Sequence, residues 1–296
     1  MKKYKRIVSM LLVCCLLITL FPTTGLALEM TSQAASEEST EGDSPNRNST
    51  VEPVYKVRDD VSASLTPVAT TSEIEVAYPV EGGNIYLDLS SGTITRSDYT
   101  VTNVVIPTDV EGVPITTIGS RAFRWCEDLT SVTLSKNITN IEYDITESGS
   151  PFYRCSSLTE LLVAENNANF ISVNGVLFSK DQTALYCYPL GREDSEYAIP
   201  ENVINIMHGA FWYGENLTSI TIPENVVNIG NSAFEGCSNL TSISLPNSVK
   251  NLGRDAFQDC SNLTDITIGG NVSKINSGTF WGCTSLACIT ISDSVT

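Results

Sequence analysis

Histidine is nearly absent from this 296-residue chain, which contains only His208. Motifs of serine hydrolases, dinucleotide-binding domains, P-loop NTPases, zinc proteases and EF-hands are missing as well. His208 occupies a position that is Asn231 and Arg254 in later repeats, which predicts an exposed turn residue. The acidic pair Glu193-Asp194 has the chemistry for glycoside hydrolysis, but it lies in a Gly-Arg-Glu-Asp-Ser segment typical of a solvated turn. The sequence therefore predicts no enzyme, no catalytic or metal-binding residues and no cofactor.

Basic residues are also scarce. The chain has 17 Lys and Arg against 34 Asp and Glu, which gives a formal net charge of −17. A surface of this sign repels nucleic acid and anionic lipid. We therefore exclude nucleic acid as a partner, while the charge does not by itself select a partner among the remaining classes.

The N-terminus has the order of a secretory signal peptide. Four basic residues lie within the first six positions, an apolar run covers residues 7–21, and the small residues Gly25 and Ala27 follow. This order predicts a signal peptide over residues 1–27. An uncleaved anchor is the alternative, but the run is short for a span and polar sequence follows at once. We expect a secreted or cell-surface protein with no membrane span in the mature chain.

Residues 28–72 are rich in Ser, Thr, Glu and Pro and contain few large apolar residues. They show no period, and such a segment cannot bury enough apolar surface to offset its ordering entropy. We predict a disordered linker.

A period of 23 residues then marks the rest of the chain. The aligned units read L-x-x-I-x-I-P-x-x-V-x-x-I/L-G-x-x-A-F-x-x-C-x-x-L. A fixed period of this length is typical of a solenoid. With insertions allowed, the period extends upstream, so that the array covers residues 73–296 with one insert at about 164–199. Six aromatic anchors mark six coils: Phe123, Phe152, Phe211, Phe234, Phe257 and Phe280.

Each unit predicts a strand, a return segment and a turn. In the unit that starts at Leu217, Ile220 and Ile222 point to the core, and Pro223 ends the strand because proline cannot donate to a ladder. Val226 and Ile229 return the chain along the core edge. The Ala-Phe-x-x-Cys segment suits a helical turn. Stacked at the strand spacing of about 4.8 Å, the units predict short parallel strands with helical or 3-10 turns.

The cysteines follow the same period. Of the nine, two lie in the predicted signal peptide, and no C-x-x-C pair occurs among the others. Five share one repeat position, where a small buried hydrophobe fits, and Gly214 holds that position in another coil. We predict a core ladder rather than a metal site or disulfides between coils. Its members are Cys126, Cys155, Cys237, Cys260 and Cys283. Cys288 takes an outward strand position and is predicted to be the most accessible thiol.

These residues resemble the BspA-type leucine-rich-repeat family. The match rests on the repeated I-P-x-x-V-x-x-I-G-x-x-A-F-x-x-C-x-x-L-T-x-I pattern and on the segments 174–181 and 184–189, which resemble a hairpin repeat of that family. The resemblance implies a leucine-rich-repeat solenoid of the α/β type with one hairpin insert. It also implies a bacterial extracellular or surface protein, since some members of the family act as adhesins for matrix proteins or host cells.

The outward strand positions form the candidate binding face. They carry mostly small hydroxyls, which suit many weak hydrogen bonds to an extracellular protein or glycan, although hydroxyls are also ordinary on a solvated sheet. The predicted face comprises Ser219, Thr221, Ser242, Ser244, Asp265, Thr267 and Thr290. The aromatic residues Trp125, Trp212, Tyr213 and Trp281, by contrast, are interpreted as edge packing around the anchors.

Two functions remain open from the sequence. In the first, the array itself mediates protein–protein interaction or adhesion to host cells, neighbouring cells or matrix. In the second, the array is a scaffold or spacer for a C-terminal domain, such as a catalytic domain, that is missing from this chain. The second arises because the sequence stops at Thr296, midway through a coil, which predicts truncation.

Overall fold

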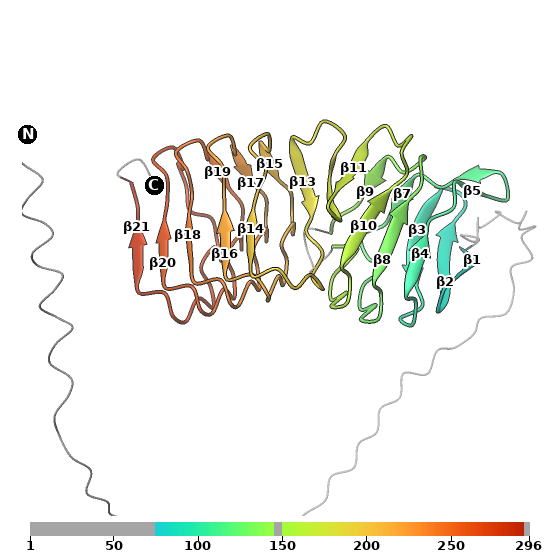
Figure 1. The fold of residues 1–296 in the computed structure, drawn as a ribbon, viewed down its shortest axis with the longest axis horizontal. Coiled ribbons are helices and arrows are strands. Elements are labelled where there is room, and N and C mark those ends of the chain that lie inside the picture. Colours follow the sequence, from blue (N-terminus) through green and yellow to red (C-terminus); the bar gives the residue numbers. More distant parts are fainter. Residues whose placement is uncertain (1–74, 145–149, 293–296) are drawn as a thin grey trace, which may run out of the picture. The chain divides into compact units, whose positions relative to one another are not determined.

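A computed structural model describes residues 75–144 and 150–292, all within one compact unit, Thr66–Thr296. The predicted signal peptide, 1–27, and the predicted linker, 28–72, lie outside the described residues. The described part is a solenoid of stacked coils (Figure 1), as the 23-residue period predicts. Short strands of neighbouring coils pair in parallel along the array, and the fold class is therefore confirmed.

The C-terminal coils show the repeat most regularly. One sheet is formed by the L-x-x-I-x-I segments, which pair in parallel along the array. Its strands are β14 (Glu196–Ala198), β16 (Ser219–Thr221), β18 (Ser242–Ser244), β20 (Asp265–Thr267) and β21 (Cys288–Thr290). The return segments pair as well, which sequence periodicity did not predict. Their strands are β13 (Ala184–Cys187), β15 (Asn205–Ile206), β17 (Asn228–Ile229) and β19 (Asn251–Leu252).

The N-terminal coils repeat this arrangement on a different entry unit. The entry unit is an antiparallel sheet of β1 (Glu75–Val80), β2 (Gly83–Asp88) and β3 (Thr93–Ser97). Parallel pairing then continues from β3 to β7 (Thr117–Ile118) and β9 (Asn140–Ile141). The counterpart of the sheet that contains β14 to β21 consists here of β4 (Asn103–Val105), β8 (Ser131–Leu134) and β10 (Glu160–Val163). A small hairpin joins β5 (Asp109–Val110) to β6 (Val113–Pro114).

The predicted hairpin insert separates these two halves. Strands β11 (Phe170–Val173) and β12 (Val176–Ser179) pair in antiparallel fashion around Asn174-Gly175. Both turn residues have positive φ, 52° and 82°, as a two-residue hairpin turn requires. Strand β12 is buried on both faces: Val176 and Phe178 join the C-terminal core, and Leu177 joins the N-terminal core. The hairpin therefore connects the two cores rather than forming a surface loop.

The segment after each aromatic anchor is not helical, and this part of the prediction is wrong. No helix occurs within residues 75–144 and 150–292. The Cys237 amide donates to the Phe234 carbonyl at 3.2 Å, which closes a single turn. Gly236 then adopts a φ of +73°, in the left-handed region that interrupts a right-handed helix. The amides of this turn donate to the next coil instead: Phe234 to Ala256 at 2.9 Å and Gly236 to Gln258 at 2.8 Å.

The anchor rings form one continuous stack through the C-terminal core. Phe234 lies 5.1 Å from both Phe211 and Phe257, with interplanar angles of 16° and 4°. The stack continues from Phe257 to Phe280 at 6.0 Å. Tyr188 extends it into the insert, because its ring lies 5.4 Å from Phe211 and its amide donates to Ala210. The N-terminal half holds a separate stacked pair, Phe123 and Phe152, at 5.8 Å.

We predict that Phe234→Ala lowers the free energy of unfolding by about 3–5 kcal/mol, because the ring is fully buried between two stacked neighbours. Urea unfolding followed by circular dichroism measures this loss. Tyr99→Ala, at a side chain that is 68% exposed, is the control and should change stability by less than about 1 kcal/mol. Equal effects of the two substitutions would contradict the stacked core.

Candidate binding surfaces

The outward positions of the C-terminal sheet lie in register on neighbouring strands. Ser219, Ser242, Asp265 and Cys288 form one row of paired positions. A second row contains Ser244, Thr267 and Thr290, and Thr221 lies at the equivalent end of β16. All eight side chains are exposed. The isoleucines between the two rows, Ile220, Ile243 and Ile266, are buried. We call these eight residues the strand face.

The equivalent positions of the N-terminal sheet belong to a separate surface. Ser131 and Thr133 on β8 are half-buried, whereas Glu160 and Leu162 on β10 are exposed. The insert lies beside β10, since the Leu161 amide donates to the Gly175 carbonyl at 2.8 Å. The sheet formed by β4, β8 and β10 therefore does not continue into the one formed by β14, β16, β18, β20 and β21. The predicted binding face therefore lies entirely on the C-terminal sheet, and the outward residues of the N-terminal sheet do not extend it.

The structure places the ladder cysteines beside the aromatic anchors. Cys126, Cys155, Cys237 and Cys260 are buried, Cys283 is half-buried, and Cys288 is exposed on the strand face. Each ladder thiol from Cys155 onward donates to the carbonyl of an anchor Phe in an earlier coil. These S···O distances are 3.0 Å for Cys155–Phe123, 3.2 Å for Cys237–Phe211, 3.1 Å for Cys260–Phe234 and 3.0 Å for Cys283–Phe257. The cysteine at the ladder position thus fills space in the core, and its thiol also gives the anchor carbonyl a hydrogen-bond donor.

Burial also changes the acidity of these thiols. It raises the pKa of Cys237 to about 12, because the thiolate would be desolvated. The same cause raises the pKa of Cys187, on strand β13, to about 12. Seven free cysteines lie in the described residues. In this part of the chain no group of three or more His, Cys, Asp or Glu side chains is arranged to hold a metal ion.

His208 differs from its predicted environment. It is half-buried rather than exposed, and its ring lies 5.6 Å from Tyr143 and 5.9 Å from Trp212. Burial lowers the pKa of its imidazole. In the acidic pair, Asp194 accepts from Arg192 at 2.7 Å and from Tyr188 at 3.0 Å. Its carboxylate is therefore engaged in holding the insert.

The aromatic residues around the anchors do not share one environment. Trp212 is buried, in accord with packing, but Trp125 and Trp281 are 41% and 67% exposed. Trp125 belongs to a cluster with Tyr153, Arg154 and Tyr213, which we call the turn-edge cluster. The Arg154 guanidinium lies 4.9 Å from the Trp125 ring and 5.5 Å from the Tyr213 ring. No sequence signal pointed to Tyr153 and Arg154, because coils that are distant in the chain bring them to these rings.

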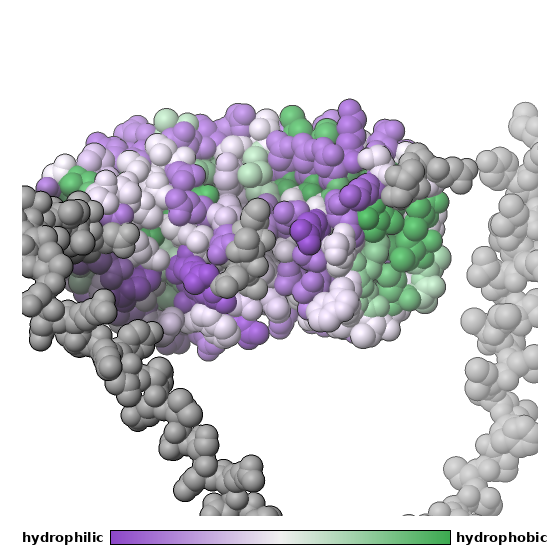
Figure 2. Space-filling model, turned by 180° about the vertical axis from the view of Figure 1, so that it is seen from behind, coloured by the Kyte–Doolittle hydropathy of each residue, from purple (hydrophilic) through white to green (hydrophobic). Residues whose placement is uncertain are grey.

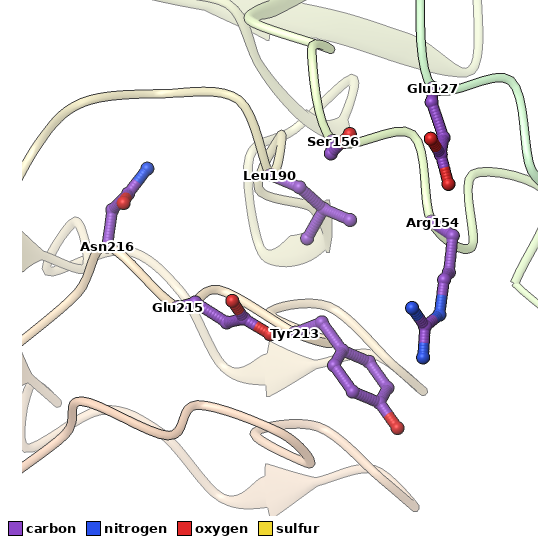
Figure 3. Close-up of a pocket in the computed structure, with 7 residues that line it drawn as sticks. All are labelled: Glu127, Arg154, Ser156, Leu190, Tyr213, Glu215 and Asn216. Carbon is purple, nitrogen blue, oxygen red and sulfur yellow. The ribbon is translucent and has the colours of Figure 1, made fainter.

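A pocket of about 360 Å³ opens beside this cluster (Figure 3). It has one guanidinium, two carboxylates and an aromatic ring in its wall, together with a hydroxyl, an amide and one apolar side chain. In Figure 3 the Arg154 side chain points toward Tyr213, and Glu127 lies above Arg154 at the right of the view. The lining residues are Glu127, Arg154, Ser156, Leu190, Tyr213, Glu215 and Asn216.

A family model described as the BspA type leucine rich repeat region matches this chain in six copies, over residues 96–182 and 190–296. The chain belongs to the BspA-type leucine-rich-repeat family. The described array is thus a BspA-type array that includes the hairpin insert. A comparison with curated proteins found no match.

Solved structures of bacterial leucine-rich-repeat proteins are similar to this chain. One is a leucine-rich repeat protein from Eubacterium ventriosum, with 19% identity and a TM-score of 0.47 over 75% of this chain and 86% of its own. The pneumococcal vaccine antigen PcpA has 23% identity and a TM-score of 0.47, over 66% of this chain and 56% of its own. A leucine rich cell surface protein from Faecalibacterium prausnitzii has 18% identity and a TM-score of 0.35, over 73% and 94%.

Apolar side chains gather on the last described coil, which exposes Trp281, Ile289 and Ile291. Figure 2 shows a hydrophobic area at the C-terminal end of the array, while hydrophilic and intermediate residues cover most of the rest of this view. In residues 75–144 and 150–292 no helix is long and apolar enough to span a bilayer.

We predict that iodoacetamide alkylates Cys288 in the native protein and leaves Cys237 and Cys260 unmodified, because the latter two are buried and hydrogen-bonded. Mass spectrometry of tryptic peptides measures the modification at each site. Unfolding in urea before alkylation is the control and should expose all three thiols. Native modification of Cys237 and Cys260 at the rate of Cys288 would contradict the ladder.

Proposed function

We propose that this protein is exported and binds an extracellular protein through the strand face, as an adhesin or a related surface interaction module. The family supports interaction with proteins in general terms. The specific proposal rests on one observation, the two in-register rows of exposed polar side chains on parallel strands.

The geometry of the strand face favours an extended partner. Each exposed hydroxyl can donate one hydrogen bond and accept others, and in-register side chains repeat at the strand spacing of about 4.8 Å. Many weak bonds of this kind add up only if the partner follows the rows over several coils. The buried isoleucines beneath them make the surface rigid, which reduces the entropy lost on binding.

Charge also bears on the partner. The strand face carries Asp265 as its one ionisable side chain besides Cys288, although the whole chain is strongly acidic. Long-range repulsion from the rest of the protein therefore disfavours acidic partners, while the face itself presents mainly neutral hydrogen-bonding groups.

We predict that replacing Thr221, Ser244 and Thr267 together with lysine leaves the fold intact and weakens binding by at least about tenfold, equivalent to about 1.4 kcal/mol. All three side chains are exposed, so the core is spared. The assay is solid-phase binding of the purified protein to immobilised fibronectin, laminin and collagen, and to intact epithelial cells.

A matched control adds the same charge elsewhere. Asn140, Asn251 and Ser277 are exposed and lie outside the strand face, so their joint replacement by lysine should leave binding unchanged. If the strand-face variant binds as well as the native protein, the site lies elsewhere. If the native protein binds none of these partners, the scaffold function becomes the better explanation.

A further inference from the structure

The residue two positions after each aromatic anchor has a left-handed backbone in all six coils. Its φ is +73° at Gly236, +76° at Gly282 and +56° at Asp259. Glycine adopts this conformation freely and aspartate tolerates it. The other three coils place bulky residues there: Trp125, Arg154 and Tyr213, with φ between +55° and +69°.

A bulky side chain in this region strains the backbone, and such strain concentrates at functional sites. The three bulky residues are not scattered along the array. They are the three that meet in the turn-edge cluster, where Arg154 lies between the Trp125 and Tyr213 rings. Tyr153 packs edge-on against both rings, at 5.7 Å and 5.6 Å. The strained positions therefore build one defined arrangement of side chains.

The insert opens the pocket beside this cluster. In four of the other five coils the left-handed residue donates its amide to the next coil, as Trp125 does to Tyr153 at 2.9 Å and Tyr213 to Glu235 at 2.7 Å; the fifth, Gly282, lies in the last described coil. Arg154 makes no such bond to any described residue, because Tyr188 in the insert is followed by Pro189-Leu190 rather than by a full turn. Coils on either side of this gap form the walls, with Leu190 between them.

From this geometry we infer a second binding site, in the pocket of Figure 3, for a neutral glycan. The two carboxylates, Glu127 and Glu215, accept hydrogen bonds from sugar hydroxyls, and the Arg154 guanidinium donates hydrogen bonds to sugar oxygens. The Tyr213 ring, which also lines the pocket, supplies apolar contact area for the C–H groups of a sugar ring. The volume of about 360 Å³ falls within the range of small-molecule sites.

The charge of the pocket selects the class of glycan. Two carboxylates and one guanidinium leave one net negative charge, so a sialylated or uronic sugar meets net repulsion. A lysine side chain pairs with a carboxylate but offers nothing to the Arg154 guanidinium, whereas a neutral sugar uses the donors and the acceptors together. The site lies on the turns and involves none of the strand-face residues, so it is independent of the proposed function.

The test uses isothermal titration calorimetry of the purified protein with four neutral disaccharides: lactose, maltose, mannobiose and diacetylchitobiose. Sialyllactose and trilysine are the charged comparison ligands. We expect saturable binding of at least one neutral disaccharide and of neither charged ligand. Arg154→Gly should weaken that binding by at least about tenfold, equivalent to about 1.4 kcal/mol. Its melting temperature should stay close to the native value, because relief of backbone strain offsets the lost ring contacts.

Asp259→Gly is the matched control, since it changes the same repeat position outside the pocket and should leave sugar binding unchanged. Glu215→Gln, at an exposed carboxylate, is a second pocket variant that should weaken binding if Arg154→Gly does not fold. The inference is overturned if no neutral disaccharide binds, if sialyllactose or trilysine binds instead, or if the pocket variants bind like the native protein. The strand-face lysine variant should bind the sugar normally, so the two proposals can fail separately.

Discussion

The structure depends on the hydrogen bonds that join the turn of each coil to its neighbours. The amides of the aromatic anchor and of the residue two positions after it donate forward, as from Phe234 to Ala256 and from Gly236 to Gln258. The ladder thiol donates back, as from Cys237 to Phe211. These bonds hold successive coils at a distance at which the anchor rings stack, 5.1 Å in the regular part of the array. A single coil buries neither its ring nor its polar groups, so stability arises only between coils.

The hairpin insert changes this pattern at one place. It extends the C-terminal ring stack to Tyr188 and connects the two cores through strand β12, but it omits the full turn that would continue the bonding at Arg154. The result is a divided strand surface on one side and a pocket on the other. The insert interrupts the repeat beside the turn-edge cluster, where an arginine, a tryptophan and two tyrosines from different coils come together.

The 23-residue period was sufficient to predict the solenoid, its parallel strands and the alternation of buried Ile with exposed Ser and Thr, whereas the hairpin was predicted from the resemblance to the BspA-type family. Prediction failed where the outcome depends on neighbouring coils. The turns look helical in sequence because Ala, Phe and Cys have helical spacing, yet their amides bond to the next coil and a left-handed residue ends the turn. His208 was expected at the surface, but it is half-buried because Tyr143, from another coil, and Trp212, from the same turn, pack against its ring. Tyr188 lies 23 residues before Phe211, and that spacing could have identified it as an anchor.

Amide hydrogen exchange measured residue by residue with NMR tests the bonding between coils most directly. Bonding of this kind predicts slow exchange at Trp125 and Tyr213, whose amides donate to the next coil, and fast exchange at Arg154, whose amide has no partner among the described residues. The three residues share one repeat position and one backbone conformation, so the comparison isolates the bond itself. Equal protection at all three amides, or fast exchange at Trp125 and Tyr213, would contradict the hydrogen bonding between coils.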